Sequence, residues 1–157
     1  MTGFRRGARL GIDVGKARVG VARCDPDGML AVPVETVPRD DASVGRVVAI
    51  ASEYDVIEML VGFPLSLSGG STASTDDAVS FARAVAAASG LPVRLVDERL
   101  STVSAHAALR DAGRSQKSSR RIVDQVAAVV LLQQAIDVEK RSGNPAGTPL
   151  EDTQETH

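Results

Sequence analysis

Three acidic positions in this 157-residue chain stand where carboxylates could do chemistry together. Asp13 ends a short alternating strand pattern, and Glu98 follows Asp97 at the end of another. Asp124 lies in a helical run that is apolar nearly all round. A carboxylate in such a setting must be paired, hydrogen-bonded or bound to a metal, because burying it alone costs several kcal/mol. Three converging carboxylates form a hard-oxygen site that suits Mg²⁺ or Mn²⁺.

Such a site is typical of phosphodiester hydrolysis. Two divalent cations about 3.5–4 Å apart can hold the attacking and leaving oxygens of a phosphodiester. Taken singly, Asp13 could simply close a turn, and Asp124 could pair with Arg120 or Arg121. Their joint placement at predicted strand ends favours metal chemistry. We therefore predict that Asp13, Glu98 and Asp124 ligate the metal and form the catalytic site.

The basic residues are concentrated in two blocks. Residues 1–23 and 99–121 each carry six basic groups and one acid, whereas 24–98 carry four against twelve and 122–157 carry two against six. The overall charge of −2 argues against a nucleic-acid binder, but both basic blocks contain or adjoin the three acids. Solvated surface is the ordinary alternative for such runs, and for Arg99 it is pairing with Asp97. The predicted nucleic-acid-binding residues are Lys16, Arg18, Arg99, Arg110, Arg114, Lys117, Arg120 and Arg121.

Four other positions have simpler interpretations. Gly15 and Gly20 are predicted to form a tight structural turn that lets a phosphate approach, and hairpin geometry alone explains them equally well. His106 lies among alanines and is predicted to be a packing residue. Cys24, the single cysteine, is predicted to lie near the surface and to be inert, with an intermolecular disulfide as the alternative. One cysteine provides no internal disulfide framework and fits a reducing cytosol.

The element order predicts one mixed α/β sheet with helices on both faces. Three hairpin-connected antiparallel strands come first, and Pro33 favours an edge position for the third. Helices and strands then alternate. Residues 142–157 are acidic and without periodicity, so we expect a single domain over 1–141 and a disordered acidic tail over 142–157. No apolar run reaches the length of a membrane span, and the start lacks a secretory signal. The predicted strands are 8–13, 18–24, 30–37, 56–61 and 93–96, and the predicted helices are 40–51, 76–88, 101–111 and 118–139.

The run Gly-Ile-Asp-Val-Gly-Lys-Ala-Arg-Val-Gly-Val-Ala at 11–22 resembles the signature of the YqgF/RuvX family of RNase H-like nucleases. Segments 61–65, 97–102 and 117–128 match in order, so the resemblance covers roughly residues 8–137. It implies an RNase H-like, five-stranded mixed sheet. It also implies a bacterial cytoplasmic nuclease that matures the 5′ end of the small-subunit ribosomal RNA precursor, or that resolves Holliday junctions. Asp13, Glu98 and Asp124 fall on the family's acidic positions. The loop 68–75 lacks an acidic residue expected there, which leaves the substrate open.

Three alternatives remain. Asp-x-Gly at the end of a first strand also opens the phosphate hairpin of actin-like ATPases and sugar kinases, but those need a second domain and a second Gly-rich loop. A non-catalytic RNA-binding module for ribosome assembly would keep the basic blocks without turnover. Within the nuclease class, precursor RNA and branched DNA are both open, and a resolvase would need a two-fold homodimer, for which no interface can be identified in the sequence.

Overall fold

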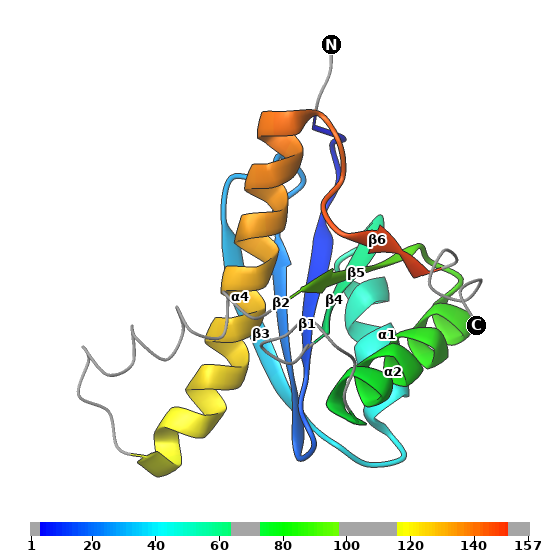
Figure 1. Ribbon diagram of the computed structural model, residues 1–157, viewed down its shortest axis with the longest axis vertical. Coiled ribbons are helices and arrows are strands. Elements are labelled where there is room, and N and C mark those ends of the chain that lie inside the picture. Colours follow the sequence, from blue (N-terminus) through cyan, green and yellow to red (C-terminus); the bar gives the residue numbers. More distant parts are fainter. Residues whose placement is uncertain (1–3, 64–72, 98–115, 151–157) are drawn as a thin grey trace.

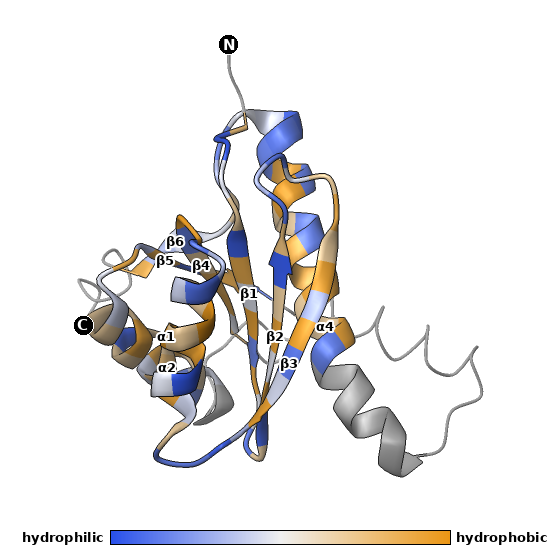
Figure 2. Ribbon diagram, turned by 180° about the vertical axis from the view of Figure 1, so that it is seen from behind, coloured by the Kyte–Doolittle hydropathy of each residue, from blue (hydrophilic) through white to orange (hydrophobic). Residues whose placement is uncertain are grey.

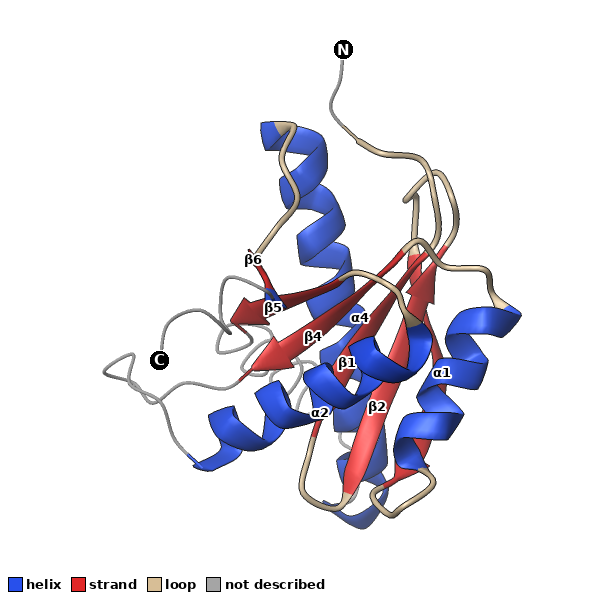
Figure 3. Cartoon of the chain, turned by 90° about the vertical axis from the view of Figure 1, so that its right-hand side faces the viewer, coloured by secondary structure: helices blue, strands red, loops and turns tan. Residues whose placement is uncertain are grey.

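The computed structural model describes residues 4–63, 73–97 and 116–150, with the backbone alone for 73–74 and 116–124. In this part of the chain, a six-stranded sheet has the order β3-β2-β1-β4-β5-β6. Helices α1 and α2 cover one face, and α4 crosses the other (Figures 1 and 3). No helix within these ranges is both long enough and apolar enough to cross a membrane.

The first three strands form the predicted antiparallel meander. They are β1 (Arg9–Val14), β2 (Arg18–Cys24) and β3 (Ala31–Pro38). Strand β3 lies at the edge of the sheet, as Pro33 predicts, because proline has no N–H to donate to an outer neighbour. The register shifts between Val21, which pairs with Glu35, and Ala22, which pairs with Pro33, so the β-bulge lies in β3 at Val34, next to that proline.

Helices alternate with parallel strands in the rest of the domain. The elements are α1 (Ser43–Glu53), β4 (Glu58–Phe63), α2 (Ala73–Ser89), β5 (Val93–Asp97) and α4 (Gln116–Ser142). Strand β4 pairs in parallel with both β1 and β5, so the predicted mixed sheet with helices on both faces is confirmed. The helix predicted over 101–111, with His106, lies outside the described residues.

Two hydrophobic cores reflect the alternation of side chains along each strand. Leu10 and Ile12 lie in the core beneath α1 and α2, whereas Leu60 and Cys24 lie in the core beneath α4. The alternating apolar and polar bands of α4 in Figure 2 are those of a helix with one buried face. The predicted surface position of Cys24 is wrong, because its strand places it under α4 with no exposed area. Burial raises the pKa of the Cys24 thiol, and a side chain so enclosed cannot form an intermolecular disulfide.

The stretch after residue 142 is ordered as far as Leu150, which corrects the predicted tail. Strand β6 (Thr148–Pro149) pairs antiparallel with β5 and is the sixth strand, where the sequence predicts five. Arg94 donates hydrogen bonds to the carbonyls of Ala146 and Gly147, at 2.7 and 2.9 Å, and Leu150 is buried. A two-residue strand has no periodicity to detect in the sequence. Its position depends instead on contacts with β5, which lies far away along the chain. Residues 151–157 lie outside the described residues.

Candidate active site

Asp13 lies in a row of residues that crosses the sheet, and glycine flanks it on both sides. It is opposite Gly20 of β2 and opposite Gly62 of β4. The row continues to Thr36 on β3 and to Val96 on β5. Residues directly opposite one another place their side chains on the same face of a sheet. Neither immediate neighbour therefore contributes a side chain beside the Asp13 carboxylate.

That row faces helix α4. Two residues before Asp13, a Cβ added at Gly11 would lie 2.8 Å from Leu132 Cβ and 2.9 Å from the Ala128 carbonyl, so the helix packs directly on the backbone there. Side chains of a strand alternate between faces, which puts Asp13 on the same side as Gly11. Asp13 is 9% exposed, so its charge has to be balanced by nearby donors or cations.

Helix α4 runs antiparallel to β1 and reaches the level of Asp13 near residue 125. Glu139, near the end of the helix, accepts a hydrogen bond from Arg9 at the start of β1 at 3.1 Å. Gln125, near its beginning, donates a 2.8 Å hydrogen bond to the hydroxyl of Thr36, which belongs to the Asp13 row. The backbone of residue 124 is thus brought to the sheet edge where Asp13 lies, and the side chain of Asp124 is among those not described.

The alternation of side chains along β5 decides which residues near its end share the face of Asp13. Asp97 is two residues from Leu95, which packs in the core under α1 and α2, so Asp97 belongs to the face opposite Asp13. Val96 belongs to the face of Asp13. Glu98, the acid that the sequence predicts as a metal ligand, lies outside the described residues.

The turn after Asp13 is held by a clamp that the sequence analysis missed. The Gly15 amide donates to the Arg18 carbonyl at 2.8 Å, and a Cβ at Gly15 would be 2.8 Å from that oxygen, so glycine is required. Arg39 donates to the Gly15 carbonyl at 2.9 Å and makes two further 2.9 Å contacts with Asp77 of α2. Hydrogen bonding to Arg39 lowers the pKa of Asp77 below its usual range.

Two of the predicted nucleic-acid-binding residues, Lys16 and Arg18, lie on and next to this turn. Lys16 is exposed at the turn and lines an open pocket with Arg39, Asp40 and Asp77. Arg18 begins β2 and lines a second pocket, between β3 and α4. Gly20, predicted as a turn residue, lies instead inside β2, opposite Asp13. A cross-strand register of this kind cannot be detected in a single sequence.

The second basic block cannot be placed in the same way. Lys117, Arg120 and Arg121 belong to the first turns of α4, for which the backbone alone is described. Arg99, Arg110 and Arg114 lie outside the described residues. No group of three metal-binding side chains occurs among the described side chains, which include neither Glu98 nor Asp124.

The comparisons with known proteins agree with this architecture. The fold is that of an RNase H-like α/β domain with an acid at the end of its first strand. The chain belongs to the RuvX family, whose model, described as Holliday junction resolvase, matches residues 7–138.

Relatives match over nearly the whole chain. A protein of Clavibacter michiganensis subsp. michiganensis named "Putative pre-16S rRNA nuclease" is 58% identical, over 92% of this chain and 91% of its own length. Proteins of the same name from Leifsonia xyli and Streptomyces coelicolor are 55% and 49% identical, each over 94% of this chain and over 97% and 90% of their own lengths. The fold resembles a solved structure of T. thermophilus RuvC with a Holliday junction substrate, at a TM-score of 0.56 and 18% identity, over 90% of this chain and 98% of that one.

Proposed function

We propose that this chain is a divalent-metal-dependent nuclease that hydrolyses phosphodiester bonds in the precursor of 16S ribosomal RNA, in the bacterial cytoplasm. The observation that carries the proposal is the Asp13 row. A nearly buried carboxylate lies one residue before the end of β1, both neighbouring strands contribute glycine beside it, and the first half of α4 leads to the same edge. Family membership and the names of the relatives point to the same class of reaction.

The acidic residues fit a hard divalent cation. Asp13, Glu98 and Asp124 would hold Mg²⁺ or Mn²⁺, since carboxylate oxygens are the donors that these ions prefer. A bound cation would polarise the phosphodiester and activate the attacking water. The glycines at 20 and 62 admit a phosphate close to the sheet, because no side chain stands in its way.

The cations would position the substrate strand. Lys16, on the clamped turn, and Arg18, beside the second pocket, lie at the Asp13 end of β1 and would contact phosphates near the cleavage point. Arg99, Arg110, Arg114, Lys117, Arg120 and Arg121 would extend this contact along the strand. Since phosphate contacts release counterions, we expect substrate binding to weaken steeply with salt.

Substitution of Asp13 tests the mechanism directly. We expect Asp13→Asn to lower cleavage of labelled precursor RNA by roughly 100-fold or more, because the substitution removes a charged ligand and keeps the shape. Wild type, Asp13→Asn and the exposed α4 variant Asp137→Asn are compared with Mg²⁺, with Mn²⁺ and with EDTA. Asp137→Asn should match wild type. Equal cleavage by wild type and Asp13→Asn would overturn the proposed mechanism.

A second candidate is resolution of branched DNA, which the family's description and the RuvC-like fold favour. The same experiment therefore includes a labelled four-way junction and a measurement of oligomeric state. Cleavage of the junction by a dimer in preference to precursor RNA would replace the RNA proposal with a resolvase. Binding of RNA without cleavage of either substrate by folded wild type would indicate a non-catalytic assembly module.

A further inference from the structure

A polar pocket of about 410 Å³ lies on the α4 face of the sheet, beside the Asp13 row. Strands β2 and β3 form its floor, and Gln125 of α4 forms one wall. Its lining residues are Arg18, Val34, Glu35, Thr36, Pro38 and Gln125.

The hydrogen bond between Thr36 and Gln125 leaves at least one donor and one acceptor side by side. Gln125 Nε2 donates to Thr36 Oγ1 at 2.8 Å, so the hydroxyl keeps its own proton to donate and Gln125 Oε1 keeps its lone pairs. Turning the amide round exchanges these roles and still leaves a donor next to an acceptor. No other hydrogen bond joins either side chain to another residue whose side chain the structure describes. A pair of this kind complements a hydroxyl group, which donates and accepts at once.

The position of the pair matches a strand that runs past Asp13. Thr36 lies two strands from Asp13 in the same row, about 10 Å away at the usual strand spacing. This distance corresponds to a few nucleotides along a bound strand that has one of its phosphates at Asp13. Gly20, between them, contributes no side chain to the row.

Two charged residues, Arg18 and Glu35, line the pocket. Arg18 provides a cation there. The one acid of the lining, Glu35, accepts a 2.9 Å hydrogen bond from Arg46 of α1, which lowers the pKa of its carboxyl and balances its charge. Glu35 is therefore already paired and is not available to hold a second cation in the pocket.

We propose that this pocket binds a ribose of the substrate strand and that Thr36 and Gln125 recognise its 2′-hydroxyl. The inference rests on the proposed nuclease function and deepens it, because a 2′-hydroxyl is what distinguishes RNA from DNA at one position. It assigns the substrate class to RNA. It also predicts that discrimination occurs at a single nucleotide close to the cleavage point, and not along the whole strand.

A substrate series with single 2′-deoxy substitutions tests this assignment. In wild type, one deoxy position flanking the cut should lower kcat/KM roughly 3- to 10-fold, the value of one hydrogen bond. Thr36→Val keeps the shape of the side chain and should lower cleavage of the all-ribose substrate by a similar factor. The variant should then show no further loss at that deoxy position, and Gln125→Met should behave alike. The control Thr148→Val, on exposed β6, should keep the full sensitivity.

Two results would overturn the inference. One is that no single deoxy position affects wild type. The other is that Thr36→Val remains as sensitive as wild type to the deoxy position. If wild type cleaves no RNA, the proposed function fails, and the same series is measured as binding with Asp13→Asn and Asp13→Asn/Thr36→Val. A deoxy penalty in Kd that disappears with Thr36→Val supports the ribose pocket, and its absence or persistence rejects it.

Discussion

Single residues around Asp13 are specified by their neighbours across the sheet. Gly20 and Gly62 flank the carboxylate, Thr36 ends the row with its bond to Gln125, and Gly15 turns the chain just beyond. The acid, its turn and its cations follow from local sequence, because a strand end followed by Val-Gly-Lys has a local signature. The cross-strand partners do not, because register arises from pairing between distant segments.

The Arg39 clamp gives a prediction at this scale. Arg39→Lys cannot keep both contacts to Asp77 and the contact to the Gly15 carbonyl, because an ammonium lacks the planar fork of the guanidinium. The turn that carries Lys16 would loosen, so we expect KM for RNA to rise several-fold with a smaller change in kcat. Steady-state cleavage kinetics measure this split. The matched control is Arg6→Lys, whose exposed pair with Asp27 is remote from the turn. Equal KM values for both variants would contradict the positioning role.

Helix α4 spans the sheet from the Glu139 end to the Asp13 end, and its packing depends on a close approach to Gly11. Its apolar residues predict a long buried helix, as observed, since periodicity is a local property. The strand residue that lets the helix approach cannot be predicted from local sequence. Gly11 lies in the family-like signature, but its close approach to Ala128 and Leu132 is visible only in the folded structure. Strand β6, unlike α4, has no periodic pattern that predicts it, and the segment that leads to it is held by hydrogen bonds from Arg94.

Gly11→Ala tests the role of that approach. The added methyl would meet the backbone of Ala128, so α4 must move away, at a cost of about 1–3 kcal/mol in unfolding free energy. We expect cleavage by the folded variant to fall at least tenfold, because the start of α4 carries Asp124. The matched control is Gly45→Ala in α1, where a Cβ meets nothing within 4 Å. That substitution should raise the unfolding free energy by about 0.5–1 kcal/mol and leave cleavage unchanged. Full activity of folded Gly11→Ala would contradict the prediction.

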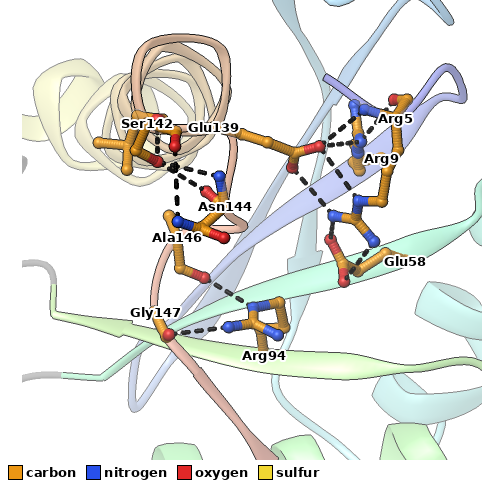
Figure 4. A network of polar contacts seen from close by, with 10 residues as sticks. Arg5, Arg9, Glu58, Arg94, Glu139, Ser142, Asn144, Ala146 and Gly147 are labelled. Atoms are coloured by element: carbon orange, nitrogen blue, oxygen red, sulfur yellow. Dashed lines mark hydrogen bonds and ion pairs between the residues drawn. The ribbon is translucent and has the colours of Figure 1, made fainter. Parts of the chain in front are cut away.

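At the scale of the molecule, the basic residues of the first block lie at two different ends of the sheet. The first basic block looks like a nucleic-acid surface in the sequence, yet much of it is structural. Arg5 and Arg9 bind Glu58 and Glu139 at the end of β1 opposite Asp13 (Figure 4), and Arg23 lies over the ring of Tyr54. Lys16 and Arg18 are the members that the fold directs to the Asp13 end. Charge counted along a chain predicts a basic surface only where the acidic partners lie elsewhere.

The network around Glu139 gives a prediction about pH. Glu139, with a side chain 5% exposed, accepts hydrogen bonds from Arg5 and from the buried Arg9. Burial acts to raise the pKa of Glu139, and the hydrogen bonds from Arg5 with the charges of both arginines lower it overall. The carboxylate therefore stabilises the fold above its unfolded pKa of about 4.3, and that stabilisation disappears as pH falls through the lower folded value.

Glu139→Gln should accordingly lower the unfolding free energy at pH 7 by roughly 3 kcal/mol, because it leaves the buried Arg9 guanidinium without its counter-charge. The difference from wild type should shrink as pH falls below 4, where wild-type Glu139 itself becomes protonated. Urea unfolding between pH 3 and pH 7 measures both effects, with Glu53→Gln at the exposed end of α1 as the control. Cleavage by the folded variant should remain near that of wild type, since the network and Asp13 lie at opposite ends of β1. A loss of stability that is equal at both pH values would show that packing, and not the ion network, holds this end of the molecule together.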